Sequence, residues 1–285
     1  MFVKVAGKIL EIPGEDIFPV IRQLPSLRVF ASGVPAPPEK PAMRFEMGRI
    51  VPPADGLQVL YDFEVEGVRS IFGRHGDTYD FRMTEGDAEL LAMRKKQGDA
   101  LVEATATESL TAFRFGLWMA CNLAMVELGA VAIHSSTVVR DGRAVLFLGE
   151  SGTGKSTHTR LWLNNLEGSW LLNDDSPFIT VEHGQAVVYG SPWSGKTHCY
   201  KPERIPIAGI VRLSQAPHNQ IRRLPPVAAF GAIYPSLPPA FAYDEYLTDR
   251  LCALASKVLE KVPVYHLECL PDRAAALLSS TTVFG

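Results

Sequence analysis

The spacing of hydrophobic and polar residues changes about a third of the way along the chain. In the first hundred residues, hydrophobic and polar positions alternate in short runs that glycine-rich turns separate, which is typical of β-strands. The proline-rich stretch 32–41 indicates an exposed, extended connector, because proline can neither donate to a strand ladder nor continue a helix. We therefore predict a small β-rich accessory domain over residues 1–105, with strands at 2–5, 44–47, 57–65 and 79–83.

A second domain, over residues 106–285, is predicted to mix helices with strands. Residues 109–128 form an apolar run with one narrow polar line, which predicts a nearly buried helix. The strands predicted at 130–139 and 144–148 are joined by so short a turn, around Asp141-Gly142, that they must be antiparallel. We expect further strands at 170–173, 178–182, 186–189, 207–213 and 262–267, and helices at 247–261 and from about 272. The fold class is therefore α/β, with a mixed and strand-rich sheet.

A phosphate-binding loop (P-loop, Walker A sequence) follows the strand at 144–148. The pattern G-x-x-x-x-G-K-[ST] turns up by chance in roughly one random chain of this length in a hundred, and here a buried strand precedes it and a helix-forming segment follows. Backbone N–H groups of such a loop cradle phosphates, its lysine reaches the β and γ oxygens, and its hydroxyl binds Mg²⁺. We therefore predict that ATP and Mg²⁺ bind at Gly149, Glu150, Ser151, Gly152, Thr153, Gly154, Lys155, Ser156 and Thr157.

An acidic pair, Asp174-Asp175, ends the strand predicted from residue 170. A kinase needs one carboxylate to hold Mg²⁺ and often a second to orient or deprotonate the acceptor hydroxyl. We predict that Ser156 and Asp175 bind the metal, although the sequence leaves open which aspartate is the base. The alternative is a polar turn, which Asp-Asp-Ser-Pro also favours.

Three further side chains are weaker candidates. His134 lies on the strand that pairs with the loop strand, where it could tune a carboxylate or shuttle a proton, or be purely structural. Lys196, after the flexible Gly195, could belong to a lid or substrate-binding loop, and Arg204 could share that role. A solvated turn is the alternative for this segment.

Composition narrows the class of protein. The chain of 285 residues is 47% hydrophobic and 21% charged, which is ordinary for a globular protein, and its net charge of -3 gives no reason to expect nucleic acid or an acidic membrane as partner. The N-terminus lacks the apolar core of a signal peptide, and the hydrophobic window 110–128 contains charged residues, so it fits a core helix better than a membrane span. The four cysteines are scattered, without metal-type spacing. We expect a cytoplasmic enzyme.

Three segments, in order, resemble the catalytic domain of HPr kinase/phosphorylase: 132–136 (Ala-Ile-His-Ser-Ser), the loop, and 171–175 (Leu-Leu-Asn-Asp-Asp). The loop is also similar to that of ATP-dependent phosphoenolpyruvate carboxykinase, which shares this P-loop fold. The resemblance covers residues 128–270. It implies that His134 and one aspartate activate the acceptor, that the other aspartate and Ser156 bind Mg²⁺, and that Lys155 holds phosphate. Segment 190–196 also resembles HPr-kinase-like proteins of peptide-modification gene clusters.

These observations predict a phosphotransferase that moves the γ-phosphoryl group of ATP to a hydroxyl, most simply a serine of a protein or peptide. One alternative is a small-metabolite P-loop kinase, although there the loop opens the first strand–helix unit of the chain, whereas here 148 residues precede it. The other is a non-catalytic module that senses ATP and presents the N-terminal domain to a partner. A homo-oligomer is left open.

Overall fold

The computed structural model describes residues 1–33, 40–195 and 197–285. The chain forms two compact units, one of Met1–Leu128 with Ala240–Thr248 and one of Gly129–Pro239 with Asp249–Gly285. Most of the predicted proline-rich connector lies outside the described residues. The mixed, strand-rich α/β class is confirmed. Among the residues that the structure describes, no helix has both the length and the apolar character that a membrane span needs.

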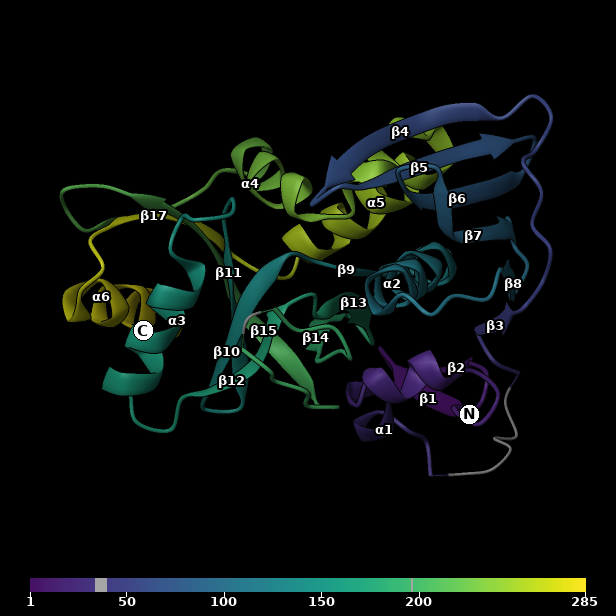
Figure 1. Cartoon of the computed structure of the whole chain (residues 1–285). Helices are drawn as coiled ribbons and strands as arrows, with labels where there is room; N and C mark the ends of the chain where they lie inside the picture. Colours follow the sequence, from purple (N-terminus) through teal and green to yellow (C-terminus); the bar gives the residue numbers. More distant parts are fainter. Residues whose placement is uncertain (34–39, 196) are drawn as a thin grey trace. The chain divides into compact units, whose positions relative to one another are not determined.

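The first unit contains an eight-stranded sheet in the order β1-β2-β3-β8-β7-β6-β5-β4 (Figure 1). Its strands are β1 (Phe2–Val5), β2 (Lys8–Glu11), β3 (Met43–Met47), β4 (Gln58–Val65), β5 (Val68–His75), β6 (Thr78–Glu85), β7 (Ala88–Lys96) and β8 (Leu101–Ala104). Its helices are η1 (Pro19–Gln23), α1 (Ser26–Val29) and α2 (Leu110–Val126), and most of η3 (Pro239–Tyr243) also belongs to it.

Helix α2 begins where the sequence indicates, because the Ser109 side chain accepts a hydrogen bond from the Ala112 N–H at 3.3 Å. It packs against β7 and β3 of the first unit. The approach to β7 is so close that a Cβ atom on Gly116 would lie 2.1 Å from a methyl group of Leu91. The N-terminal segment of the first unit therefore includes α2 and extends to Leu128, whereas the predicted accessory domain covers residues 1–105.

The second unit contains a nine-stranded sheet in which the twelve-residue strand β15 connects two parts. The first residues of β15 pair with β14, and its later residues lie between β11 and β17. The elements are β9 (Ala130–Ala132), β10 (Ser135–Arg140), β11 (Arg143–Leu148), α3 (Lys155–Asn165), β12 (Trp170–Asp175), β13 (Phe178–Glu182), β14 (Gln185–Tyr189), β15 (Arg204–Gln215), β16 (Gln220–Arg223), α4 (Pro226–Ile233), η2 (Tyr234–Ser236), β17 (Val264–Cys269) and α6 (Arg273–Phe284). Helix α5 (Glu245–Leu259) crosses the boundary between the units.

The predicted strand 130–139 is two strands in the structure. β9 pairs with β13, whereas β10 pairs with β11 and β12, and all of these pairings are antiparallel. The antiparallel neighbour expected for the loop strand β11 is therefore confirmed, but it is formed by the second half of the predicted strand only. His134 lies at the junction between the two halves rather than within a strand.

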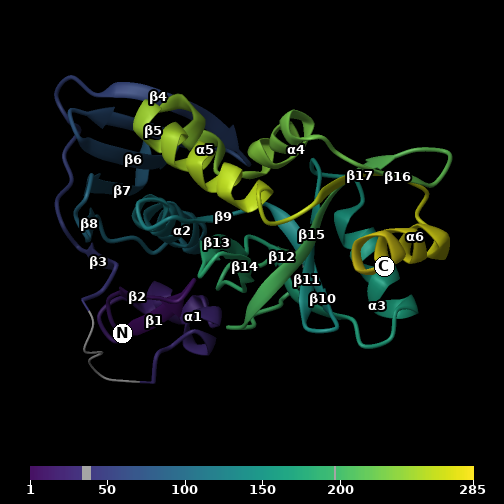
Figure 2. The ribbon, with the colours of Figure 1, turned by 180° about the vertical axis from the view of Figure 1, so that it is seen from behind.

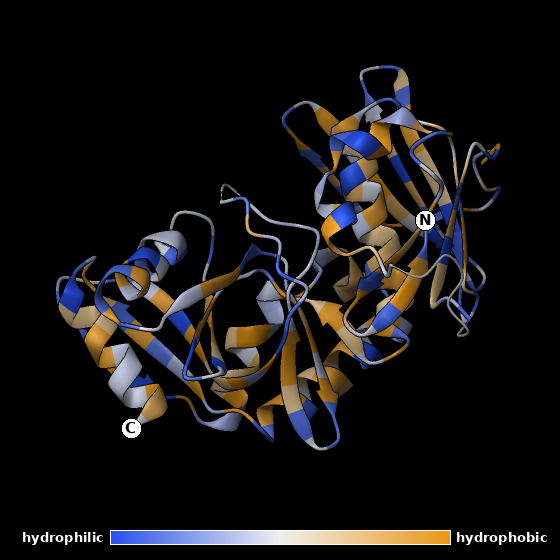
Figure 3. Ribbon diagram, turned by 90° about the horizontal axis from the view of Figure 1, so that it is seen from below, coloured by the Kyte–Doolittle hydropathy of each residue, from blue (hydrophilic) through white to orange (hydrophobic). Residues whose placement is uncertain are grey.

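Helices α3 and α6 pack side by side against one face of β10, β11 and β15, as Figures 1 and 2 show. Their shared core is built from fully buried side chains such as Phe147, Trp162, Val211 and Leu267. Figure 3 shows hydrophobic residues along the strands and hydrophilic residues at the hairpin ends. The helix that follows the loop is thus fixed to the sheet by apolar burial, the main favourable term in folding.

A buried histidine belongs to this core. Its Nε2 lies 3.0 Å from Ser279 Oγ, and the indole N–H of Trp162 donates to the same Ser279 oxygen at 2.9 Å. Burial lowers the pKa of His158 from 6.5 to about 4. Because the folded protein binds this proton less tightly than the unfolded chain, stability must be lost as the pH falls through this range.

We predict that the free energy of unfolding decreases between pH 6.5 and 4 by about 3 kcal/mol through His158 alone. In His158→Gln this contribution should vanish, so the difference in stability between the two proteins should shrink as the pH falls. Urea denaturation at several pH values measures it, with His218→Gln on the exposed surface as control. A difference that does not change with pH would contradict the prediction.

Candidate functional site

The glycine-rich loop of residues 149–154 connects β11 to α3 and depends on its glycines. Gly149, Gly152 and Gly154 have φ angles of +151°, +83° and +99°, which side chains with a Cβ atom rarely adopt. At Gly149 there is also no room, because a Cβ would lie 2.5 Å from Thr153 Oγ1. The backbone is therefore free to turn sharply and present its N–H groups ahead of the helix.

Lys155, the first residue of α3, folds back over this loop. Its Nζ donates to the carbonyl oxygens of Gly149 at 2.7 Å and Glu150 at 3.1 Å. Burial lowers its pKa, and the charges of Asp175 and Asp174 oppose that shift. The first turn of α3 adds N–H groups without partners inside the helix and the positive end of its dipole. Together these groups supply the positive charge and N–H donors that an anion needs.

The two aspartates are the last residues of β12, as predicted, so they do not lie in the polar turn that was the alternative. Asp174 lies opposite Ser136 of β10, and the Ser136 hydroxyl is bonded at 2.7 Å to Thr159 of α3. Because directly opposed residues share a face of the sheet, Asp174 lies on the α3 side. Its Oδ1 is 3.4 Å from Ser156 Oγ.

Asp175, the next residue, is on the other side of the pleat. Its Oδ1 lies 3.4 Å from His134 Nδ1, and the two side chains remain 31% and 50% exposed. The backbone N–H of His134 donates to the Ser236 carbonyl at 2.7 Å, which fixes the histidine at the junction of β9 and β10. The predicted neighbours of the loop are thus brought together, with each aspartate in a different environment.

This arrangement differs from the predicted metal ligands in one respect. We predicted from the sequence that Ser156 and Asp175 bind the metal, whereas in the structure Ser156 lies beside Asp174. The physical reason is that successive side chains of a strand point to opposite faces of the sheet. A hydroxyl and a carboxylate oxygen fit Mg²⁺, which takes one or two protein oxygens and completes its shell with phosphate and water. The described part of the chain holds no cluster of three or more His, Cys, Asp or Glu for a metal.

Asn173 is a positioning residue that the sequence pattern did not reveal. Its Oδ1 accepts from the backbone N–H groups of Asp175 at 3.1 Å and Ser176 at 3.0 Å, and its Nδ2 donates to the Trp193 carbonyl at 3.0 Å. The side chain therefore fixes the backbone just where β12 ends. The sequence signal was an amide at the end of an apolar strand, which is a favoured place for such local bonds.

The remaining cationic candidates differ in their positions. Arg204 is ion-paired with Glu182 at 2.9 Å at the start of β15, whereas the loop lies beyond the other end of this strand. Eight residues of strand, roughly 26 Å, separate Arg204 from Arg212, so Arg204 is not brought to the loop. Arg212, which sequence analysis did not single out, has its Nη2 3.7 Å from the Glu150 carboxylate of the loop. Lys196 lies outside the described residues.

Segment 194–195 runs directly against the acidic pair. The Gly195 N–H donates to the Asp174 carbonyl at 2.7 Å, and a Cβ atom on Gly195 would lie 2.7 Å from that same oxygen. Such a contact is closer than a side chain tolerates, so only glycine fits.

We predict that Gly195→Ala lowers the free energy of unfolding by about 1–3 kcal/mol, because the new methyl group must displace backbone. Gly231→Ala is the matched control: it has open space in helix α4 and should be neutral or stabilising. Urea denaturation compares the two variants. Equal stabilities would show that the contact with Asp174 yields without cost.

Known proteins similar to this chain are found among solved structures. Neither family models nor curated protein sequences match the chain. The chain is similar to the Hpr(Ser) kinase/phosphatase from Coxiella burnetii, with 16% identity and a TM-score of 0.33, over 53% of this chain and 87% of that one. A similarity this low in identity and TM-score assigns neither family nor activity. The family resemblance stays a prediction, and function rests on the geometry of the site.

Proposed function

We propose that the second unit is a P-loop phosphotransferase, with the fold of phosphoenolpyruvate carboxykinase, that moves the γ-phosphoryl group of ATP to a hydroxyl. The observation that carries this proposal is the meeting of three groups at one site: Lys155 on the loop, Ser156 with Asp174, and Asp175 with His134. Phosphoryl transfer depends on positioning and electrostatic stabilisation more than on covalent chemistry. These three groups supply the corresponding functions.

The phosphates of ATP would lie on the loop and on the first turn of α3. In the proposed complex, Lys155 Nζ exchanges the carbonyls of Gly149 and Glu150 for phosphate oxygens. Ser156 and Asp174 would hold Mg²⁺, which neutralises charge on the phosphates. The glycine backbone and the fixed helix provide these donors before ATP arrives, so little reorganisation opposes transfer.

Asp175 is the proposed base. As the acceptor oxygen attacks the γ-phosphorus, its proton passes to an Asp175 oxygen, and the bond from the γ-phosphorus to the bridging oxygen breaks to release ADP. His134, through its contact with this carboxylate, orients Asp175 and adjusts its basicity. The proposal thus assigns the metal to Asp174 and the proton to Asp175.

The exposure of the proposed base supports a large acceptor. The side chains of Asp175 and His134 are 31% and 50% exposed, whereas Asp174 is buried near the loop. A serine side chain carried on a protein or peptide can therefore reach the Asp175 carboxylate. The strand order also supports this class over small-metabolite kinases, because β11 has antiparallel β10 on one side and parallel β15 on the other.

The first prediction for this function concerns Lys155. Lys155→Ala should reduce ATP turnover by about 10²–10³, because it removes one fixed positive charge that meets the transferring phosphoryl group. ATP consumption is measured with a mixture of serine-containing peptides, and mass spectrometry identifies what gains phosphate. Lys257→Ala, on the exposed surface of α5, is the control. Unchanged turnover in Lys155→Ala would exclude the loop as the site of transfer.

The second prediction separates the two aspartates. Asp174→Asn should weaken binding of Mg-ATP, because it removes the charged partner of Ser156. Asp175→Asn should leave Mg-ATP binding intact and slow transfer by about 10²–10⁴. Isothermal titration and peptide phosphorylation measure the two effects independently. If the effects are exchanged between the two variants, the assignment of roles is reversed; if neither variant differs from the parent, the pair takes no part.

A further inference from the structure

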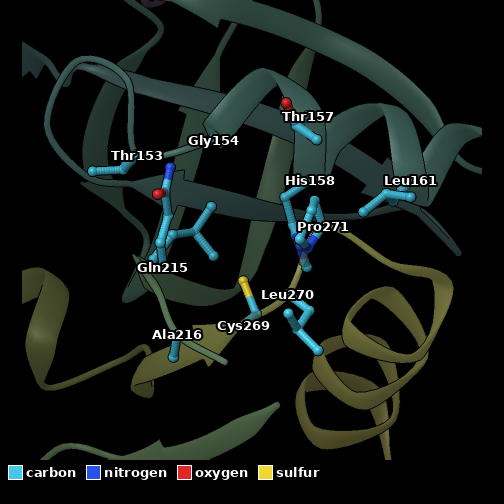
Figure 4. A pocket seen from close by; sticks show the side chains of 11 residues that line it. Thr153, Gly154, Thr157, His158, Leu161, Gln215, Ala216, Cys269, Leu270 and Pro271 are labelled. Carbon is cyan, nitrogen blue, oxygen red and sulfur yellow. The ribbon is translucent and has the colours of Figure 1, made fainter. Parts of the chain in front are cut away.

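A pocket of about 480 Å³ opens beside the glycine-rich loop (Figure 4). Its lining begins at Thr153 and Gly154 of the loop, extends beyond the loop and does not include the acidic pair. One wall is formed by Gly154, the residue before α3, and by Thr157, His158 and Leu161 on one face of that helix. These positions follow the helical spacing i, i+3, i+4, i+7, so the wall runs about 10 Å along the helix from the phosphate-binding end. The volume lies within the ordinary range of small-molecule sites.

The opposite wall is apolar and comes from the ends of β15 and β17. Leu213, Ala216, Leu270 and Pro271 line it, together with the half-buried thiol of Cys269. The pocket is thus a slot between two largely apolar walls that begins at the phosphate-binding loop. A flat, largely apolar group attached to a phosphate chain fits this shape.

Several polar groups around the slot are already bonded to the protein. The Gln215 amide Nε2 donates to the Gly152 carbonyl at 3.1 Å, and the Thr153 hydroxyl donates to the Glu150 carbonyl at 2.9 Å. The Thr153 hydroxyl proton and one of the two Gln215 amide N–H groups are therefore already used by the loop.

Backbone groups of the opposite wall are occupied too. The Ala216 N–H donates to the Cys269 carbonyl at 3.2 Å, and the Leu270 N–H donates to Asn219 Oδ1 at 2.8 Å. The imidazole of His158 is neutral near pH 7, since burial lowers its pKa to about 4, and its unpartnered Nδ1 is itself buried. The pocket thus offers contact area but few hydrogen bonds with which to read an attached group.

We infer that this pocket binds the nucleoside of the nucleotide whose phosphates lie on the loop, and that it holds the base by apolar contact with little selection between purines. The inference rests on the proposed function. A site built to hydrogen-bond its ligand rejects the wrong one by 10⁴ or more, whereas apolar pockets discriminate far less. The dissociation constants of Mg-ATP and Mg-GTP should therefore agree within about tenfold.

The unmodified protein allows a direct test, because Cys269 lies in the pocket wall. Iodoacetamide should alkylate Cys269 more slowly with Mg-ATP or Mg-GTP bound, whereas Mg-tripolyphosphate, which occupies only the loop, should leave its rate unchanged. Peptide mass spectrometry follows the reaction at alkaline pH, since burial raises the pKa of this thiol. Cys252 on α5, outside the pocket lining, is the internal control and should react equally in all samples.

A variant provides the second test. Ala216→Phe fills the slot with a ring and should weaken Mg-ATP binding by about tenfold or more, while Mg-tripolyphosphate binding stays unchanged. Ala228→Phe places the same ring on the exposed face of α4 and should bind both ligands like the parent.

The outcomes separate this inference from the function on which it rests. If neither ATP nor tripolyphosphate binds, the proposed function fails. If both bind but Cys269 stays equally reactive and Ala216→Phe has no effect, the nucleoside lies elsewhere and the inference is overturned, while the phosphotransferase proposal stands. A preference for one purine of more than about 100-fold would overturn the weak selection of the base.

Discussion

The site depends on one constraint in the sheet of the second unit: two antiparallel neighbouring segments both leave regular strand geometry at the same level. β9 pairs with β13 and β10 pairs with β12, and between these two pairings the Ile133 N–H donates to the Pro177 carbonyl at 2.9 Å. His134 and the end of β12 are therefore released from regular strand geometry beside each other, which places His134 next to Asp175.

The pleat then divides the acidic pair. Two adjacent carboxylates in a flexible turn would share one environment and repel each other, and their roles would be interchangeable. Within β12 they point to opposite faces, so Asp174 lies with Ser156 near the helix and Asp175 lies with the more exposed His134. A strand thereby gives two identical residues different partners, which is what the proposed roles of metal ligand and base require.

Features that a short local pattern determines could be predicted from the sequence. Features that depend on how distant strands pair could not. The loop and its flanking strand and helix are encoded within a few residues, and the structure contains them. The partner of each aspartate depends on which residue of β10 lies opposite, and Arg204 depends on the length and direction of β15, which starts earlier than the apolar run at 207–213 indicated. The break at His134 follows from pairing with β13, a contact between residues nearly fifty positions apart.

The two sides of the site differ in how firmly they are held. Helix α3 is tied to β10 through Ser136 and Thr159, and to α6 through Trp162 and Ser279, all of them buried. The proposed phosphate side is therefore organised before any ligand binds, as a site for a highly charged group needs to be. On the proposed acceptor side, Asp175 and His134 are partly exposed, and their nearest side-chain atoms lie 3.4 Å apart. In the proposed reaction, the order that transfer requires on that side would then come from the acceptor itself. Selection of an acceptor would accordingly depend on surfaces beyond these residues, whereas binding of a phosphate donor would depend on the packing of α3.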